Sequence, residues 1–261
     1  MSFLPAAIQT RSLSIGYPVR GGGKRVVHTG LDLALEAGCV TCLLGRNGAG
    51  KSTLLRTLCG LQPPLAGEVL LGGDPLRTLS AAALSMRVGV VLTVRDYPGG
   101  ISVYELVSLG RYPHTGFFGS LGVTDHAAVR EALEAVGIAD KAGRLLSELS
   151  DGERQKAYIA KTLAQECPVI LLDEPTSFLD VPSKLETWKT LRALAHGQGK
   201  AILLSTHDLD SALRMADRLW LLPEADADGT GGAVICGTPA ALAADGTLEN
   251  FFGIQLPQGG F

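Results

Sequence analysis

The sequence predicts an α/β fold that has an antiparallel β layer near its N-terminus and a helical sub-domain inserted into its core. Three short apolar runs, CVTCLL, PVILLD and KAILLST, do not alternate with polar residues, which is typical of parallel strands buried on both faces. Each run is followed by a helical pattern, which indicates stacked βα units. Between residues 96 and 149 the strand signal is absent and amphipathic helices replace it.

The composition is that of a globular chain. Its 261 residues can bury a full core, and the contents of 46% apolar and 19% charged residues exclude the disordered class. A net charge of −3 offers no electrostatic footprint for nucleic acid, so we expect any bound phosphate to be held by a local motif. No apolar run reaches the length of a membrane helix, and the N-terminus lacks the pattern of a signal peptide. We therefore expect a cytosolic protein.

The five cysteines are scattered along the chain, which agrees with a reducing compartment. Cys39 and Cys42 form a C-x-x-C pair. Because both fall in a predicted buried strand, where positions i and i+3 point to opposite faces, they cannot share a metal. We interpret them as core residues and expect no zinc or redox site there.

The predicted elements have ordinary start and stop signals. Alternation of Leu31, Leu33 and Leu35 after the β-rich RVV predicts antiparallel strands, with RGGGK as a hairpin turn. In the helical region, Ser102 and Glu105 have the spacing of a capping box. Near the C-terminus, DGTGGAVICG predicts a last hairpin followed by a short helix. A second helix of the inserted region has one apolar face before a glycine stop, made by Val129, Ala132, Leu133, Val136 and Gly137.

These patterns predict one domain over residues 7–241. Its core is expected at about 7–93 and 150–241, and the inserted helical sub-domain at about 96–149. Residues 242–261 are expected to form a short tail.

A glycine-rich loop follows the first buried strand and precedes a helix. Its sequence, GRNGAGKST, is the complete G-x-x-x-x-G-K-[ST] phosphate-binding pattern. The glycines let successive N–H groups point at an anion, and the helix N-terminus adds positive potential. Lys51 would reach the β- and γ-phosphates, and Ser52 would bind Mg²⁺. The loop therefore predicts a site for a nucleoside triphosphate such as ATP. Its residues are Gly45, Arg46, Asn47, Gly48, Ala49, Gly50, Lys51, Ser52 and Thr53.

Two carboxylates end a second buried strand, VILLDEP. The strand would bring Asp173 beside the phosphate loop to hold Mg²⁺, and Glu174 would reach a water in line with the γ-phosphate. A positioned base contributes on the order of 10²–10⁴ in rate, so Glu174 is expected to be the carboxylate most damaging to neutralise.

The stretch LSDGE, which begins at Leu149, decides the family. Ser150 and Glu153 form a capping box, but this explains neither Leu149 nor Gly152. With VILLDEP at the far end of the helix, the chain resembles the ATP-binding subunit of ATP-binding-cassette transporters over nearly all its length. The resemblance implies a RecA-like phosphate-loop core and a head-to-tail homodimer holding two ATP. In that dimer Ser150 and Gly152 contact the γ-phosphate bound by the partner subunit; Asp151 stands where the family usually has glycine.

Other elements are similar to those of the family. Tyr17 in LSIGY resembles the aromatic residue that stacks on adenine, Asp180 in SFLD resembles the loop that couples the two sites, and His207 in LLSTHD resembles the switch histidine on the γ-phosphate. The other four histidines lack such a context. They are His28, His114, His126 and His196.

Thr93, at the end of the strand VGVVL, stands where the family usually has a glutamine that reaches Mg²⁺ and the attacking water. Threonine is shorter than glutamine by roughly 3 Å, so we expect Thr93 to act through a bridging water or after the loop moves closer.

The segment ISVYELVSLGRYPHTG is similar to that of ATPases for uptake of iron–siderophore, haem and cobalamin compounds. This likeness implies a peripheral motor on the cytoplasmic side of the inner membrane, with two integral permease subunits and, indirectly, a substrate-binding protein. A transporter ATPase for another substrate class is an alternative. A soluble cassette ATPase acting on nucleic acid or ribosomes is another, but those proteins usually carry two cassettes or a distinctive insertion. Another phosphate-loop enzyme, such as a nucleotide kinase, is disfavoured by LSDGE and His207.

Overall fold

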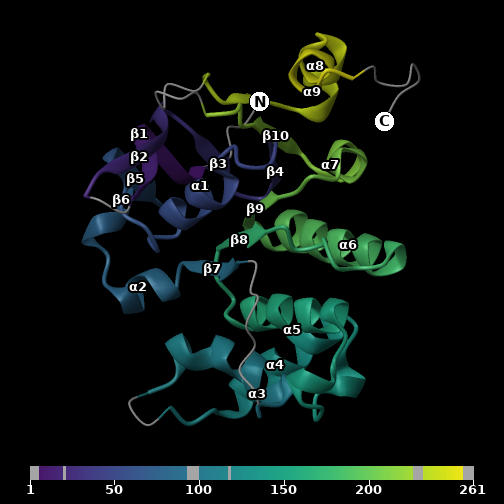
Figure 1. Ribbon diagram of the computed structural model, residues 1–261. Helices are drawn as coiled ribbons and strands as arrows, with labels where there is room; N and C mark the ends of the chain where they lie inside the picture. Colours follow the sequence, from purple (N-terminus) through teal and green to yellow (C-terminus); the bar gives the residue numbers. More distant parts are fainter. Residues whose placement is uncertain (1–5, 20–21, 93–99, 117–118, 226–231, 255–261) are drawn as a thin grey trace.

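The computed structural model describes residues 6–19, 22–92, 100–116, 119–225 and 232–254. A small antiparallel sheet and a larger, mainly parallel sheet form the upper part of the view in Figure 1, and a helical region lies below them. This arrangement is the α/β fold that the sequence predicts, with the antiparallel layer and the helical insertion in their expected places.

The smaller sheet contains the first strands of the chain. Strand β1 pairs antiparallel with β2, β3 and β5, and β5 pairs with β6. Leu31, Leu33 and Leu35 are buried while Asp32 and Ala34 between them are exposed, so the predicted alternation is confirmed. The strands are β1 (Ala6–Pro18), β2 (Lys24–Leu31), β3 (Ala34–Glu36), β5 (Ala66–Leu71) and β6 (Asp74–Pro75).

The larger sheet has the order β11-β10-β4-β9-β8-β7, in which only the β10–β11 pairing is antiparallel. The three apolar runs are β4, β8 and β9, and each is buried along its whole length. The β10–β11 pair is the expected last hairpin. The strands are β4 (Val40–Leu44), β7 (Val88–Val91), β8 (Val169–Asp173), β9 (Ala201–Ser205), β10 (Arg218–Leu221) and β11 (Ile235–Gly237).

The parallel sheet is covered on both faces, which explains why its strands do not alternate in polarity. Leu171 and Leu203 pack toward α1 (Lys51–Leu58) and the antiparallel sheet. Their neighbours Ile170 and Ile202 pack on the opposite face, toward α6 and α7 on the right of Figure 1. Burying each such side chain contributes about 1.5–3 kcal/mol. The remaining helices around the sheets are α2 (Ala81–Ser85), α6 (Val181–Gln198), α7 (Leu209–Met215), α8 (Pro239–Ala244) and α9 (Thr247–Phe252), with a 3₁₀ turn at Leu76–Thr78.

The helical region has a core of its own, and α5 belongs to it. The sequence expectation ended this sub-domain near Leu149, but Ala157 and Ile159 of the following helix pack into the same cluster as Val129 and Leu133. The capping boxes of α3 at Ser102 and of α5 at Ser150 are both present. The region comprises α3 (Val103–Ser108), α4 (Val123–Ala135) and α5 (Asp151–Ala164), with 3₁₀ turns at Leu109–His114, Ala139–Lys141 and Leu146–Glu148.

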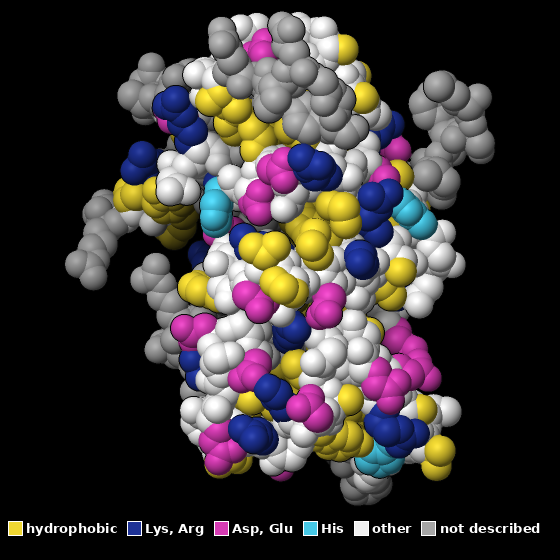
Figure 2. All heavy atoms as spheres, turned by 90° about the vertical axis from the view of Figure 1, so that its right-hand side faces the viewer, with side chains coloured by type: hydrophobic (Ala, Val, Ile, Leu, Met, Phe, Trp, Pro, Cys, Tyr) yellow, Lys and Arg dark blue, Asp and Glu magenta, His cyan; other side chains and the backbone are white. Residues whose placement is uncertain are grey.

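Charged side chains of both signs are interspersed on the face shown in Figure 2. Among the helices that the structure describes, none is both long and apolar enough to cross a membrane. Cys42 lies in the sheet core, as predicted, but the prediction is wrong for Cys39, which is half-buried and lies just before β4, outside the strand.

Candidate active site

The phosphate loop connects β4 to α1, as its motif requires. Gly48 (φ 84°) and Gly50 (φ 99°) adopt left-handed backbone conformations that are costly for other residues. Gly50 is the N-cap of α1, where no side chain caps the helix and the first turn has no acidic residue. The N–H groups of this helix start are thus left for an anion.

Lys51 is held against its own loop. Its ammonium donates to the carbonyl oxygens of Gly45 at 2.7 Å and Arg46 at 3.2 Å, and the side chain is buried. Burial lowers the pKa of Lys51, and the charges of Glu174 and Asp173 act in the opposite direction. The predicted phosphate-binding lysine and the two predicted carboxylates are thus close enough to interact electrostatically.

His28 supports the loop from the antiparallel sheet. It is fully buried, and its Nε2 donates to the Ala49 carbonyl at 2.8 Å. The sequence interpretation assigned this histidine no context, although it lies in a strand beside the buried Val27. A contact between a strand and a distant loop cannot be deduced from the local pattern of that strand.

Asp173 and Ser205 lie side by side at the ends of adjacent parallel strands. They are paired in the β8–β9 register, and they follow Leu171 and Leu203 by two residues, so they point to the same face as α1. The Ser205 hydroxyl donates to Oδ1 of Asp173 at 2.6 Å. Since β9 lies between β4 and β8, the phosphate loop and both strand ends share one edge of the sheet.

Glu174 and His207 also meet. Nδ1 of His207 is 3.3 Å from Oε2 of Glu174, and the Ser177 hydroxyl donates to the same oxygen at 2.8 Å. Glu174 has a left-handed backbone (φ 50°), which is uncommon outside glycine, asparagine and aspartate. The His207 side chain is 61% exposed, so it can reach a ligand outside the sheet. Sequence reasoning missed both Ser177 and Ser205.

The start of α5 is fixed by reciprocal hydrogen bonds. The Glu153 carboxylate accepts from the Ser150 N–H at 2.9 Å, and the Glu153 N–H donates to the Ser150 hydroxyl at 3.3 Å. Lys141 forms an ion pair with Glu153. These partners lower the pKa of Glu153 to about 2, and Lys141 makes the largest contribution. Asp151, the departure from the family pattern, forms an ion pair with Arg154 one turn further along.

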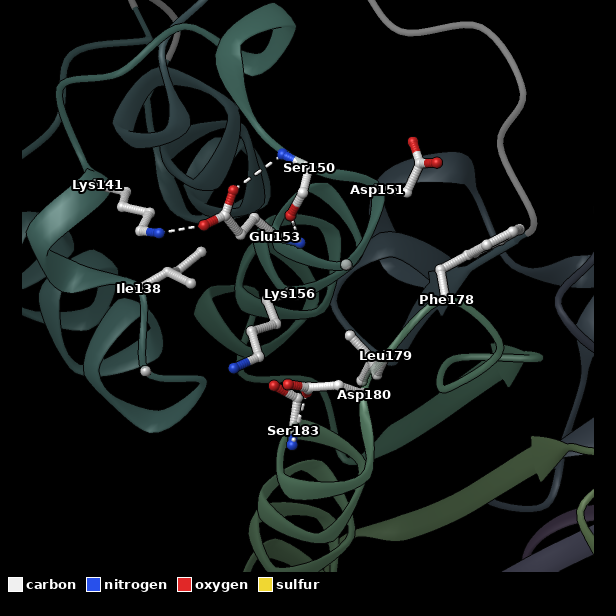
Figure 3. Close-up of a pocket in the computed structure, with 12 residues that line it drawn as sticks. Ile138, Lys141, Ser150, Asp151, Glu153, Lys156, Phe178, Leu179, Asp180 and Ser183 are labelled. Carbon is white, nitrogen blue, oxygen red and sulfur yellow. Dashed lines mark hydrogen bonds and ion pairs between the residues drawn. The ribbon is translucent and has the colours of Figure 1, made fainter.

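A pocket of about 450 Å³ joins this helix start to the segment before α6 (Figure 3). Gly152 lies close against that segment, because an added Cβ would come within 3.1 Å of the Phe178 carbonyl oxygen. Asp180 caps α6 by accepting from the Ser183 N–H at 3.1 Å. In Figure 3, Lys156 extends from α5 toward Asp180.

The pocket therefore brings Ser150, Gly152 and Asp180 together. None of its lining residues belongs to the phosphate loop, so one chain presents two separate halves of the predicted site. Tyr17 lies near the end of β1, opposite Arg25 and 37% exposed. Thr93 lies outside the described residues.

The segment around Arg111 joins the inserted region to the far end of α5. The buried Arg111 guanidinium donates to Oδ1 of Asp125 at 2.9 Å, to the Ala164 carbonyl at 2.7 Å and to Oε2 of Glu166 at 2.6 Å. Nε2 of His114 donates to the Gln165 carbonyl at 2.9 Å. Arginine and histidine thus satisfy the last carbonyls of the helix that begins at the LSDGE sequence.

A phosphate loop, two carboxylates at the end of an adjacent buried strand and an inserted helical region define a nucleotide-hydrolysing protein of the phosphate-loop class. A family model described as ABC transporter matches residues 28–177, more than half of the chain. The chain belongs to this family, as the subunit that binds and hydrolyses ATP, and the resemblance seen in the sequence is confirmed.

Known proteins agree with this assignment. The iron(3+)-hydroxamate import ATP-binding protein FhuC of Bacillus subtilis (strain 168) is 36% identical over 236 residues, which cover 90% of this chain and 86% of FhuC. A structure described as an inward-facing conformation of a metal-chelate type ABC transporter has 27% identity and a TM-score of 0.76, covering 95% of this chain and 89% of that one. A dimeric bacterial ABC transporter cassette, 24% identical with a TM-score of 0.77, covers 89% of this chain and 98% of its own and shares the fold.

Proposed function

We propose that this chain is the ATP-hydrolysing motor of an importer for an iron chelate, haem or a cobalamin compound. The observation that carries the motor role is the division of the site. Lys51, Glu174 and His207 gather at the edge of the sheet, whereas Ser150 and Gly152 line a separate pocket. Two copies arranged head to tail would complete two sites, and the similarity to a dimeric cassette supports this arrangement.

In this mechanism the phosphate loop holds ATP, and Tyr17 stacks on the adenine. On arrival of the phosphates, Lys51 exchanges its two carbonyl partners for phosphate oxygens. Glu174 takes a proton from the attacking water, and His207 and Ser177 fix the carboxylate that does so. His207 also extends to the γ-phosphate. Ser150 and Gly152 of the partner subunit contact that phosphate from the other side, and Asp180 couples the two sites.

The donor set near the loop suits Mg²⁺. The Ser52 hydroxyl and the Asp173 carboxylate are hard oxygen ligands, and a nucleotide-bound magnesium ion needs only one or two carboxylates besides phosphate and water. The Asp173 carboxylate is already oriented by its hydrogen bond from Ser205. Thr93 would contribute through a bridging water. When bound, Mg²⁺ would offset the charge of the phosphates.

The expected partners are two integral permease subunits, which the inserted helical region would contact, and a substrate-binding protein that supplies the cargo. The chain would then work at the cytoplasmic face of the inner membrane, without nucleic acid. The similarity to an iron(3+)-hydroxamate import protein and to a metal-chelate type transporter supports an iron chelate as the first cargo to test.

Affinity purification of the tagged chain from its own membranes tests the importer role. Two hydrophobic permease subunits should copurify, and an iron chelate with its binding protein should stimulate ATP hydrolysis by the complex. Haem and cobalamin serve as the alternative cargoes in the same assay. A chain that remains alone, and whose hydrolysis is stimulated by RNA or ribosomes, would support the soluble cassette ATPase instead.

A further inference from the structure

Ser205 is a buried hydroxyl at the end of a strand that is otherwise apolar. The preceding residues Ala201–Leu204 are all fully buried, and Ser205 has no exposed surface. A buried hydroxyl needs hydrogen-bond partners, and Ser205 has two of them on the adjacent strand end. Its Oγ donates to Oδ1 of Asp173 at 2.6 Å and accepts from the Glu174 N–H at 3.0 Å. One hydroxyl therefore connects the two acidic residues of the proposed site.

The hydrogen bond from Glu174 comes at a point where the backbone needs support. Glu174 has φ 50°, and a non-glycine residue stays in this region only when its surroundings hold it there. Ser205 accepts from the N–H of that residue, while Ser177 and His207 hold its carboxylate. The backbone and the side chain of Glu174 are thus fixed separately.

The neighbouring hydroxyl does not duplicate this arrangement. Thr206 accepts from the Asp208 N–H at 3.0 Å, at the start of the segment that leads into α7. Only Ser205 and Asp173 are paired across the two strands at this position. Removing the Ser205 hydroxyl would therefore take one hydrogen bond from the Asp173 carboxylate and one from the Glu174 backbone at the same time.

We propose that Ser205 is a positioning residue for ATP hydrolysis. It orients the Asp173 carboxylate for Mg²⁺ and holds the Glu174 backbone so that the carboxylate faces the attacking water. This inference rests on the roles proposed above for Asp173 and Glu174. It adds a fully buried residue that acts through both acidic neighbours.

The test compares Ser205→Thr with Ser205→Val, which are nearly isosteric and differ in the hydroxyl group. The threonine variant should keep kcat within about threefold of the wild-type value, because it retains a donor and an acceptor. The valine variant should lose tenfold or more in kcat with the KM for ATP nearly unchanged, since the phosphate loop is intact. Ser205→Ala provides the same loss of the hydroxyl without added volume. Ser85→Ala, at a partly exposed serine on α2, serves as the control.

A second measurement does not depend on turnover. Binding of Mn²⁺ to the ATP-bound protein, followed by electron paramagnetic resonance in the Glu174→Gln background, should be weaker in Ser205→Val and Ser205→Ala than in Ser205→Thr. Thermal unfolding identifies any variant that is unfolded at the assay temperature. If the valine variant is unfolded, the comparison of Ser205→Ala with the wild-type protein tests the role of the hydroxyl.

Glu174→Gln and Asp173→Asn are measured beside these variants. They test the proposed mechanism separately from the positioning role of Ser205. Suppose that Glu174→Gln and Asp173→Asn both lose hydrolysis, but the valine and alanine variants of Ser205 keep the kcat of the threonine variant. The positioning role of Ser205 is then overturned and the proposed mechanism stands. If the acid variants remain fully active, the proposed mechanism itself fails. A loss of ATP binding in proportion to kcat would reduce Ser205 to a general structural role and would also overturn the inference.

Discussion

Nδ1 of His207 lies 3.3 Å from Oε2 of Glu174, although the two residues follow different strands of the sheet. The Ser177 hydroxyl donates to the same carboxylate oxygen at 2.8 Å. Two groups therefore converge on one oxygen of the residue proposed to activate water. Their convergence fixes the direction of the carboxylate relative to the phosphate loop.

Neutralising Glu174 tests this arrangement most directly. Glu174→Gln should lower kcat by about 10²–10⁴ because a positioned base is lost, while ATP binding remains. His207→Ala should also lower kcat, and the double variant should be less impaired than the sum of the two effects, because residues in contact do not act independently. Single-turnover hydrolysis and equilibrium ATP binding measure these effects. Glu131→Gln, on the exposed side of α4, is the matched control.

Lys51→Met should weaken ATP binding strongly while the fold is retained. The ammonium is a cation that faces the phosphate loop, yet its burial carries a desolvation cost, which lowers the pKa of Lys51. Methionine fills a similar volume without that cost. Titration with a fluorescent ATP analogue should show affinity at least tenfold weaker, and thermal unfolding should show no large loss. Unchanged affinity would contradict the role of Lys51.

Arg111→Met should destabilise the inserted helical region. The substitution leaves the Asp125 carboxylate, 11% exposed, without its guanidinium partner, and breaking a buried pair in this way costs about 3–5 kcal/mol. Arg111→Met combined with Asp125→Asn should recover part of the loss, because the unpaired charge is then absent. Urea unfolding provides the free energies. Arg130→Met, on an exposed position of α4, should change the stability by less than about 0.5 kcal/mol.

Gly110 and Gly116 differ in the space available for a side chain, so alanine substitutions at the two positions should differ in their effect on stability. An added Cβ at Gly110 would lie 2.2 Å from the Lys161 carbonyl oxygen on α5, whereas at Gly116 it would meet no atom of the described residues within 4 Å. Gly110→Ala should therefore cost about 1–3 kcal/mol by overpacking, and Gly116→Ala should be nearly neutral. Equal effects of the two substitutions on the denaturation midpoint would contradict the close packing of this segment on α5.

The ion pair at the start of α5 predicts a pH dependence. Lys141 and the Ser150 N–H hold the pKa of Glu153 at about 2, below its ordinary value of 4.5. Since the unfolded chain binds this proton more readily, the stabilisation is present above pH 4.5 and is lost as the pH falls toward 2. The side chain is 29% exposed, so we expect about 1 kcal/mol at most.

Urea unfolding of wild type and Lys141→Met across this pH range measures the effect. The gap in unfolding free energy between them should be largest above pH 5 and should shrink at lower pH. Lys189→Met, an exposed lysine on α6, should show no such pattern. A gap that stays constant with pH would show that Lys141 contributes through packing alone.

Much of the fold could be predicted because its signals are local. The buried runs that became β4, β8 and β9 and the capping boxes at Ser102 and Ser150 depend only on nearby residues. The same is true of the phosphate loop. Parallel strands end at the same edge of a sheet, so the gathering of Asp173, Glu174 and His207 there followed from the predicted parallel strands.

The rest depended on contacts between distant segments. Arg111 reaches Ala164 and Glu166, and His28 of β2 reaches Ala49 in the phosphate loop. Neither pairing leaves a periodic pattern in the sequence. Ser205 looked like the ordinary end of an apolar strand because its partners belong to β8 and the residue after it. Long-range polar pairings of this kind become visible only in three dimensions.

Helix α5 contacts a different part of the molecule at each of its ends. Asp151 begins it beside the pocket that contains Ser150, and Ala164 ends it under the guanidinium of Arg111. Its 14 residues make it about 21 Å long, so a tilt of roughly 5° about one end displaces the other by about 2 Å. A small push on the Arg111 side of the molecule would thus arrive at the LSDGE loop as a shift comparable to the length of a covalent bond.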